Sequence, residues 1–592
     1  MASVRIERAN DVRESNAVAL GTIGGSLRAF VADEDDGAIV EIDVDGRKVV
    51  KASPIGTRVR DVLVLPDGRL AATLPDNGAV VVLARDATGA LREEKNVRPG
   101  EEPLALAMDA DAKRLFVTTG ASHSLVELDA GTFAERRRWA LGREPRAALV
   151  TSDGHVIVTH AAETFASVVD GDGNVTQRDT GNRELCRGGD CSGRRFARNA
   201  HAIARVGERG IVIPAAQMLP VPPGGFTKRS VCNPDKTKNR GYGVGNDEAG
   251  PPAVSDLPVF DDKDGSFFGN GFSRFEGPQC LLPRAAAGVG DDAIVACLGS
   301  ARVMRFRATP VFDFAHAKHG TPTYYHDGIL VTVRAEPIAV PAGPSGIAAT
   351  RDGTRVFVWS TFARTLTPIG IEADRANVGE SIHVDRATAR DEAWLEGREL
   401  FFTNGDKRIS HDGRACASCH VDGRDDGLAW KTPMGMRRTR LLAGQTTTAP
   451  FGWTGENATL DAHVQVTFKQ LGGTGLPEEE RKQLLAFVSS LPKPPSSPSF
   501  DDETQRGREL FTAAECATCH TNGSSDRVVH DVGTGGNFLT PTLSGIATRG
   551  RLMHDGRYRS LDELLVASTA MGKGSSLSVE DRRALVRYLA TL

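Results

Sequence analysis

Two copies of the pattern Cys-x-x-Cys-His stand in the last third of this 592-residue chain, at Cys416-Ala-Ser-Cys419-His420 and Cys516-Ala-Thr-Cys519-His520. This spacing is the attachment site of c-type haem, because two thiols add across the haem vinyl groups and the adjacent histidine lies under the iron. Zinc or dithiol redox sites are the alternative, but both copies carry the terminal histidine. The pattern predicts two covalently bound haems c, attached through Cys416, Cys419, Cys516 and Cys519, with His420 and His520 as proximal iron ligands.

The sequence around these motifs is a tandem repeat. Gly397-Arg-Glu-Leu-Phe401 precedes the first motif, Gly507-Arg-Glu-Leu-Phe511 precedes the second, and residues 439–491 align without gaps onto 540–592 with 13 identical pairs. A Pro/Ser segment, 492–498, separates the copies. We therefore expect a mainly α, tandem cytochrome c-like di-haem domain, with one lobe at 386–495 and one at 496–592. Each lobe should end in an amphipathic helix, near 478–490 and 579–591, and Ser578 is a candidate cap of the second helix.

Residues 1–385 carry a different repeat, in which an apolar strand, an Asp-Gly turn and a second apolar strand follow one another. Clear copies begin at Val62, Leu104, Ala147 and Ile347, three of them with a turn glycine at Gly68, Gly154 or Gly353, and weaker copies begin near Val18, Ala202 and Arg284. The three intervals from Val18 to Ala147 are about 42 to 44 residues. This pattern predicts an all-β, seven-bladed propeller and resembles propellers of the YVTN or NHL type. Six or eight blades, or a solenoid of strands, remain open. Insertions near 218–282 and 309–340 interrupt the period, and the second contains His316, His319 and His326 as candidate metal or haem contacts.

Five cysteines lie outside the haem motifs. Cys186 and Cys191 could close a short disulfide, and Cys232 and Cys280 bracket the first insertion and could staple it. Cys297 lies in an apolar run and is expected to be a buried free thiol. Disulfides would fit an oxidising compartment, and five unpaired thiols are the alternative.

The overall charge and hydropathy exclude some classes of partner. A formal net charge of −4 argues against nucleic acid as a bulk partner, and no apolar run reaches the length of a membrane span. No secretory signal is visible at the first residues. Covalent haem attachment normally occurs outside the bacterial cytoplasm, so we expect a periplasmic or otherwise exported protein whose signal is not part of this sequence.

The second lobe continues with Thr540-Pro-Thr-Leu-Ser-Gly545 and His554-Asp-Gly556. With two haem lobes in tandem, these segments resemble the bacterial di-haem cytochrome c peroxidase and MauG superfamily over about 200 residues. The resemblance implies that Met571 is the distal ligand of the second, electron-transferring haem and that the first haem reacts with peroxide. It also implies that Trp453, which aligns with His554 at the repeat offset, lies between the haems. A buried core tryptophan is the alternative reading.

The internal alignment also concerns the distal side of the first haem. Met571 aligns with Gln470, so the first lobe has no thioether at that position. On a helix, His463, Thr467 and Gln470 share one face, and His463 and Gln470 are candidate catalytic residues there, with Trp453 as a third. A sixth iron ligand at His463 and a solvated helix histidine are the alternatives. Met434 and Met436 are competing distal ligands.

Two departures from the family pattern affect the functional expectation. Leu471-Gly-Gly-Thr-Gly475 replaces an acidic residue after the first-lobe helix, and Arg549-Gly-Arg551 replaces the Thr-x-Pro of a calcium site, so a calcium requirement stays open. We expect a peroxidase- or MauG-like haem oxidoreductase that uses a redox partner protein and hydrogen peroxide, with the propeller as docking module. A non-catalytic di-haem electron carrier and a propeller-based binding module are the alternatives. The oligomeric state is open.

Overall fold

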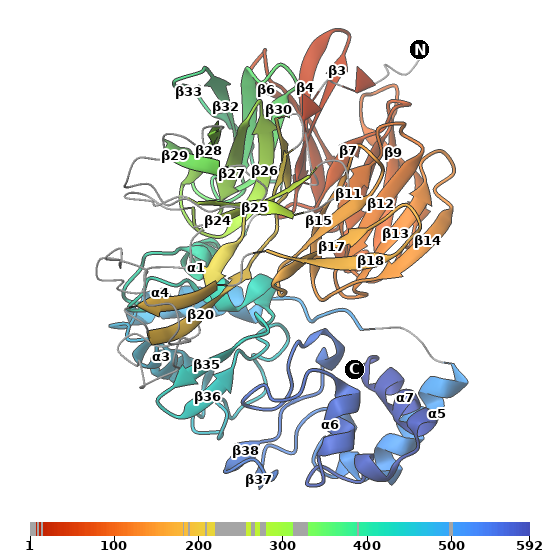
Figure 1. The fold of residues 1–592 in the computed structure, drawn as a ribbon, viewed down its shortest axis with the longest axis vertical. Coiled ribbons are helices and arrows are strands. Elements are labelled where there is room, and N and C mark those ends of the chain that lie inside the picture. Colours follow the sequence, from red (N-terminus) through yellow and green to blue (C-terminus); the bar gives the residue numbers. More distant parts are fainter. Residues whose placement is uncertain are drawn as a thin grey trace. The chain divides into compact units, whose positions relative to one another are not determined.

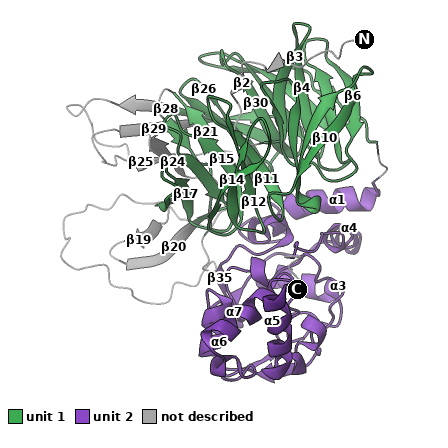
Figure 2. Ribbon diagram, turned by 90° about the vertical axis from the view of Figure 1, so that its right-hand side faces the viewer, with its two compact units in different colours: residues 1–183, 196–218, 252–389 green, residues 184–195, 219–251, 390–592 purple. Residues whose placement is uncertain are grey.

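The computed structural model describes residues 7–8, 11–12, 16–180, 183–187, 190–207, 210–218, 256–261, 267–272, 280–311, 330–387, 390–496 and 501–592. The chain divides into two compact units (Figure 2). The first comprises residues 1–183, 196–218 and 252–389, and the second comprises residues 184–195, 219–251 and 390–592.

The first unit is a β-propeller whose blades are antiparallel meanders (Figure 1). Four consecutive sheets follow the chain. The first contains β3 Val18–Ile23, β4 Ser26–Asp33, β5 Ala38–Asp43 and β6 Lys48–Pro54, and the second contains β7 Val62–Val64, β8 Leu70–Leu74, β9 Ala79–Arg85 and β10 Leu91–Val97. The third contains β11 Pro103–Met108, β12 Arg114–Thr119, β13 Ser124–Asp129 and β14 Glu135–Ala140, and the fourth contains β15 Pro145–Val150, β16 Val156–His160, β17 Phe165–Val169 and β18 Val175–Asp179. A short strand, β1 Glu7–Arg8, pairs with β3.

The remaining strands form a larger sheet and a closing sheet. The larger one has the order β21-β22-β24-β25-β29-β28-β27-β26. Its strands are β21 Ala204–Val206, β22 Gly210–Val212, β24 Asp256–Asp261, β25 Phe267–Phe272, β26 Pro283–Val289, β27 Asp292–Cys297, β28 Arg302–Val311 and β29 Leu330–Ala339. The closing sheet contains β2 Asp11–Val12, β30 Pro344–Thr350, β31 Arg355–Ser360, β32 Thr365–Ile371, β33 Ala376–Val378 and, beside β32, β34 Ile382–His383. A small sheet joins β19 Arg183–Arg187, β20 Asp190–Arg198 and β23 Ala216–Met218.

The prediction of seven blades is wrong in number, because the described residues form six. The repeats that begin near Ala202 and Arg284 share one eight-stranded sheet, since β25 and β29 pair in parallel at Phe272 and Thr332. Both strands reach into segments that the sequence pattern marked as insertions. Pairing between segments so far apart in the chain leaves no trace in a local repeat.

The predicted Asp-Gly turns are confirmed. Gly68, Gly154 and Gly353 have φ of 83°, 86° and 69°, and each donates its backbone N–H to the carbonyl three residues earlier. Glycine has no side chain and adopts these positive φ values at little energetic cost, which explains why it recurs at the turn of each repeat.

The ring closes through contacts between its first and last sheets. Asn16 Oδ1 accepts hydrogen bonds from the backbone N–H of Val18 and of Ile347, at 2.9 and 3.2 Å, and β2 pairs with β30. One apolar cluster includes Phe30 of β4 and Trp359 of β31, so the two sheets also share a core.

The cysteine expectations for this unit need correction. Cys280 and Cys297 form a disulfide with a Cα–Cα distance of 5.1 Å, so Cys297 is not a free thiol and Cys280 is not paired with Cys232. The reason is the antiparallel pairing of β26 with β27, which brings the start of one strand opposite the end of the other. Cys232, the side chains of Cys186 and Cys191, and His316, His319 and His326 lie outside the described residues.

The second unit contains two helical lobes of the same plan (Figure 1). The first lobe consists of α1 Glu392–Phe402, α2 Cys416–Cys419, η2 Val421–Gly423, the hairpin β35 Ala429–Thr432 and β36 Gly435–Arg438, α3 Leu460–Gln470 and α4 Glu478–Ser489. The second consists of α5 Asp502–Ala513, η3 Cys516–Thr518, η4 Thr521–Gly523, the hairpin β37 Val529–Asp531 and β38 Asn537–Leu539, η5 Ile546–Thr548, α6 Leu561–Ala567, η6 Gly574–Ser576 and α7 Val579–Leu589. The two expected terminal helices are therefore present, and Ser578 Oγ accepts from Asp581 N as predicted.

The lobes repeat one another in detail. A Cβ on Gly397 of α1 would lie 1.8 Å from the carbonyl oxygen of Gln483 in α4, and one on Gly507 of α5 would lie 2.0 Å from that of Ala584 in α7. Glycine therefore permits the same close helix crossing twice. Among the described residues, no helix is both long and apolar enough to cross a membrane.

Candidate haem sites

The first haem motif forms a single helical turn. Residues Cys416–Cys419 make up α2, and the backbone N–H of His420 donates to the carbonyl of Cys416 at 2.9 Å. Neither cysteine is in a disulfide, and burial raises the pKa of Cys416 to about 12. His420 Nδ1 lies 3.1 Å from the carbonyl oxygen of Arg424. Because a carbonyl accepts, Nδ1 carries the proton and Nε2 presents its lone pair, as an iron ligand must.

The second motif has the same geometry. The backbone N–H of His520 donates to the carbonyl of Cys516 at 3.0 Å, and His520 Nδ1 lies 3.3 Å from the carbonyl oxygen of Ser524. Cys516 and Cys519 are not disulfide-bonded. Burial lowers the pKa of both His420 and His520, which favours the neutral, ligating form. The donor set and its orientation therefore fit covalently attached haem c at both motifs.

The candidate distal residues of the first lobe lie on α3. His463 is half-buried, and its pKa is lowered to about 4, first by burial and then by the charge of Arg440. Asn457 Nδ2 donates to His463 Nδ1 at 3.2 Å, and the Phe451 ring stacks on the imidazole with centroids 6.4 Å apart. Gln470 is half-buried at the end of the same helix, and Thr467 donates its hydroxyl back to the His463 carbonyl.

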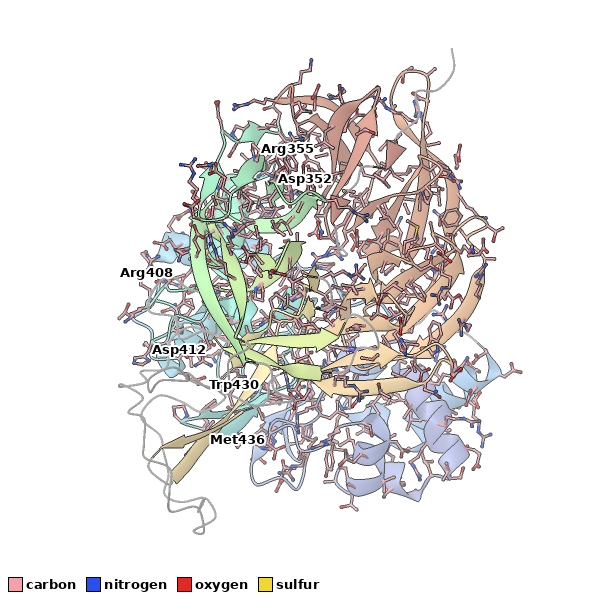
Figure 3. All side chains as sticks on the ribbon, turned by 45° about the horizontal axis from the view of Figure 1, so that its top comes forward. Asp352, Arg355, Arg408, Asp412, Trp430 and Met436 are labelled. Atoms are coloured by element: carbon pink, nitrogen blue, oxygen red, sulfur yellow. A yellow bond between two sulfur atoms is a disulfide. The ribbon has the colours of Figure 1, made fainter. Side chains whose placement is uncertain are left out.

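The candidate methionines have different surroundings. Met571 is half-buried in a loop whose next residues contact the second motif: Lys573 N donates to the Ala514 carbonyl at 2.8 Å, and a Cβ on Gly572 would meet that same oxygen. Met434 and Met436, by contrast, are 38% and 44% exposed at the tip of the β35–β36 hairpin (Figure 3).

Trp453 lies where the two lobes meet. Its carbonyl accepts from Leu539 N at 2.9 Å, and its ring is 6.4 Å from the His554 ring in an edge-on arrangement. The guanidinium carbons of Arg438 and Arg440 are 5.2 and 5.1 Å from the tryptophan ring centroid. The structure therefore places Trp453 beside residues of the second lobe.

The sequence prediction missed the arginines at this interface. Arg438 donates from its backbone N–H to the His554 carbonyl at 2.8 Å and from Nε to the Met553 carbonyl at 2.8 Å. Phe538 stacks on His554 with centroids 3.8 Å apart. The available signals were the arginine-rich segment 437–440 and Arg549 at the position of a calcium ligand.

A charged group surrounds Cys419 of the first motif. Arg414 forms an ion pair with Asp412 at 2.7 Å and lies 4.5 Å from the centroid of the Trp430 ring. Trp430 Nε1 donates to Asp426 Oδ2 at 2.9 Å. These contacts connect the β35–β36 hairpin to the segment that carries the motif.

A second charged group lies beside Cys519. His530 Nε2 is 2.6 Å from Asp526 Oδ2, so the imidazole pairs with Asp526, while Asp531 instead accepts from Gly533 N. Potential ligand atoms of Cys519, Asp526 and His530 lie within 4.8 Å of one another. Because Cys519 belongs to the second Cys-x-x-Cys-His motif, this group is part of the second candidate haem site.

Comparison with known proteins agrees with this geometry. Residues 504–592 match the family model of cytochrome c. The methylamine utilization protein MauG of Methylorubrum extorquens is 28% identical over 273 residues, which cover 33% of this chain and 76% of MauG.

Among solved structures, a hydrazine synthase chain from Kuenenia stuttgartiensis matches at 16% identity with a TM-score of 0.42, and the match covers 59% of this chain and 93% of that chain. Virginiamycin B lyase from Staphylococcus aureus is 13% identical with a TM-score of 0.36 and covers 58% of this chain and 91% of its own.

The cytochrome c match covers the second Cys-x-x-Cys-His turn, and the first lobe repeats that turn and the helix crossing around it. The chain is therefore a haem c redox protein in which a β-propeller is joined to a C-terminal cytochrome c domain similar to MauG.

Proposed function

We propose that this chain is a di-haem c oxidoreductase in which peroxide reacts at the first haem site and a redox partner protein delivers electrons through the second. The pair of equivalent motifs, each with its histidine held through Nδ1, carries the proposal. Bound haem c supplies one-electron redox chemistry and, at an open coordination position, reduction of peroxide. Reduction of one hydrogen peroxide to two waters consumes two electrons and two protons.

His463 is the residue that we propose to act on peroxide. Because Asn457 Nδ2 donates to Nδ1, the neutral imidazole carries its proton on Nε2. That N–H can donate to a peroxide oxygen, whereas iron ligation would need a lone pair on Nε2. With a pKa lowered to about 4, the ring is neutral at pH 7. Gln470, on the same face of α3, is the second polar side chain that we assign to this site.

The electron path that we propose runs through Trp453. Its backbone is hydrogen-bonded to Leu539 of the second lobe, and its ring approaches His554. Met571, on the loop tied to Ala514, would be the distal ligand at the second site. The propeller would serve as the docking module for the redox partner, in the periplasm or another exported location.

The test is an EPR and optical study of the haem-loaded protein, oxidised and half-reduced, with and without hydrogen peroxide. We expect a high-spin ferric signal that changes on adding peroxide, because one site should have an open coordination position. His463→Gln should slow the peroxide reaction by about 10²-fold or more, while His411→Gln, at an exposed histidine of the same lobe, should not. Trp453→Phe should slow electron transfer between the sites without changing either spin state.

A non-catalytic electron carrier is the second candidate. It is favoured by Leu471-Gly-Gly-Thr-Gly475, which provides no acid–base side chain at the position where the family has a carboxylate. Two low-spin signals in both redox states, unchanged by peroxide, would establish this candidate and refute the peroxide-reducing one.

A further inference from the structure

Both lobes carry the same short loop in front of a helix, α3 in the first lobe and α6 in the second. A backbone bridge between Phe451 and Asn457 closes the first loop, and the aligned residues Leu552 and Tyr558 close the second in the same way. The two loops therefore share one backbone plan, and differences between them lie in their side chains.

One side-chain contact within this loop has opposite polarity in the two lobes. In the first lobe Thr454 donates to Glu456 Oε2 from its backbone N–H at 3.1 Å and from its hydroxyl at 2.7 Å. In the second lobe the aligned residues are Asp555 and Arg557, and Arg557 Nη2 donates to Asp555 Oδ2 at 2.7 Å. The same position therefore holds a carboxylate in one lobe and a guanidinium group in the other.

The first loop has room for this carboxylate because of a glycine. A Cβ on Gly452 would collide with both carboxylate oxygens of Glu456, so the carboxylate packs against the backbone of that glycine. The aligned residue of the second lobe is Met553, and both positions have a positive φ, 94° at Gly452 and 68° at Met553. The backbone conformation is thus kept, and only the first lobe lacks a side chain where the carboxylate lies.

Glu456 belongs to a loop that also fixes the imidazole of His463. Phe451 stacks on that ring and Asn457 Nδ2 donates to its Nδ1, so both ends of the loop contact His463. The charges of Glu456 and His463 act on each other, which requires a separation of about ten ångströms or less. The loop therefore brings a carboxylate to the residue that we place next to peroxide.

His463 can hold a peroxide molecule but is poorly suited to move its protons. Its Nδ1 is occupied by the amide of Asn457, and with a pKa lowered to about 4 the ring binds no second proton at pH 7. Glu456 differs in both respects. Partial burial raises the pKa of Glu456, but hydrogen bonds from Thr454 outweigh this effect and hold the pKa below its ordinary value. The exposed carboxylate is therefore ionised at pH 7 and can exchange protons with water.

The aligned residues of the second lobe cannot perform this chemistry. Leu564 stands in place of His463, and Arg557 stands in place of Glu456. A leucine side chain forms no hydrogen bond, and a guanidinium group keeps its proton. The difference between the two loops therefore restricts proton transfer to the first lobe.

We propose that Glu456 is the acid–base group of the first site and exchanges protons with the peroxide that His463 holds, directly or through one water molecule. The inference rests on the proposed reaction of peroxide at this site. The carboxylate takes the proton from one oxygen of hydrogen peroxide and gives it to the other as the O–O bond breaks. That second oxygen keeps the electron pair of the bond and leaves as water. The remaining oxygen takes two electrons from the redox partner and two protons, and leaves as the second water.

The experiment compares Glu456→Gln and Glu456→Asp with the unchanged protein, all haem-loaded. Glutamine keeps an oxygen that accepts from Thr454 but cannot exchange a proton, whereas aspartate keeps the carboxylate on a shorter side chain. Glu479→Gln is the matched control, because Glu479 is an exposed carboxylate on α4 of the same lobe. Stopped-flow measurement gives the rates of reaction with hydrogen peroxide and of binding of hydrogen cyanide, and EPR gives the spin state.

Hydrogen cyanide separates the acid–base role from the peroxide chemistry. Like hydrogen peroxide, it must give up a proton when it binds at an open ferric site, but it is not reduced there. The rate of cyanide binding therefore reports proton transfer at the first site whether or not peroxide reacts.

We expect Glu456→Gln to slow both reactions by about 10²-fold and to keep the high-spin signal. Glu456→Asp should recover most of the rate, and Glu479→Gln should match the unchanged protein. Rates in Glu456→Gln equal to those of the unchanged protein, an equal loss in Glu456→Asp, or a changed spin state in Glu456→Gln would each overturn the inference.

The unchanged protein tells failure of the inference from failure of the proposed function. Cyanide binding without a peroxide reaction would refute the peroxide chemistry, and the cyanide rates of the Glu456 variants would still decide the acid–base role. Two low-spin sites that bind no cyanide would refute both.

Discussion

At three histidines of the cytochrome unit, one hydrogen bond at Nδ1 decides what Nε2 can do. His420 and His520 donate from Nδ1–H to a backbone carbonyl, which leaves a lone pair on Nε2 for iron. At His463 the Asn457 amide donates to Nδ1, which leaves the proton on Nε2. The same ring nitrogen, Nε2, therefore carries a lone pair at His420 and His520 and a proton at His463, because the group bound to Nδ1 is an acceptor in two cases and a donor in the third.

Met571→His should lower the midpoint potential of the haem that we propose at Cys516 and Cys519. A thioether ligand stabilises ferrous iron relative to an imidazole, so the exchange favours the ferric form. Spectroelectrochemical titration measures the shift. The control is Met434→His, at an exposed position on the hairpin tip; an equal shift there would remove Met571 from the site.

His160 of the propeller should make the stability of that unit depend on pH. It is fully buried between the Arg143 carbonyl and the Ser167 hydroxyl, and burial lowers its pKa from 6.5 to about 4. The unfolded chain therefore binds more protons between these values, and the free energy of unfolding should fall by on the order of 2–3 kcal/mol as pH drops from about 6.5 to about 4.

Urea unfolding of the propeller signal at several pH values measures this dependence. His160→Gln should flatten the curve over that range, whereas His383→Gln, at an exposed histidine, should leave it unchanged. A pH dependence that persists in His160→Gln would assign it to other groups.

At the scale of elements, one helix crossing defines each cytochrome lobe. The crossing of α1 with α4, and of α5 with α7, brings a glycine of one helix against a backbone carbonyl of the other. Aromatic side chains pack beside both crossings, with centroids of Phe401 and Phe487 5.2 Å apart and of Phe511 and Tyr588 5.5 Å apart. The helices therefore meet at backbone distance, and the bulky side chains fill the space on either side.

Gly507→Ala should destabilise the second lobe by about 2–4 kcal/mol. Helix propensity alone would make the alanine variant more stable by roughly 0.5–1 kcal/mol. The close helix crossing therefore reverses the sign of the expected change in unfolding free energy. Thermal unfolding followed by circular dichroism at a helix wavelength provides the measurement. Arg508→Ala, at the neighbouring exposed position of α5, is the control and should be near neutral; stabilisation by Gly507→Ala would contradict the observed crossing.

At the scale of the whole molecule, each unit depends on contacts between distant parts of the chain. The propeller ring closes where Arg364 of the last sheet, 4% exposed, forms ion pairs with Asp33 at 2.7 Å and Asp36 at 2.8 Å from the first sheet. The cytochrome unit depends on contacts between its two lobes: Arg438 Nε donates to the Met553 carbonyl, 115 positions away, and the Trp453 ring approaches the His554 ring.

Arg364→Met should destabilise the propeller by about 3–5 kcal/mol, because it leaves two buried carboxylates without their counterion. Arg355→Met is the control, since Arg355 pairs with Asp45 at the surface and such pairs contribute about 0–1 kcal/mol (Figure 3). Denaturant unfolding measures the loss of unfolding free energy in both variants. Equal, small losses in the two variants would show that ring closure does not depend on the buried ion pairs.

The amino-acid sequence by itself determined the features that are built from neighbouring residues. Each Cys-x-x-Cys-His turn is closed by a hydrogen bond within the motif, and the turn at Gly68 needs the local φ that glycine allows. The helix at 579–589 is read from its cap and its periodicity. The cytochrome c character of the second lobe, the lobe repeat and the propeller strands could therefore be predicted.

The tertiary structure alone decided the features that depend on which distant segments meet. The disulfide partner of Cys297, the merging of β25 with β29 into one sheet, and the gathering of Arg438, Arg440 and Arg549 all depend on long-range pairing. A residue's type states what it can bind, but its burial and its neighbours decide its protonation and its counterions. For that reason the sequence located the two Cys-x-x-Cys-His motifs, and only the folded chain revealed which side chains meet between the two lobes.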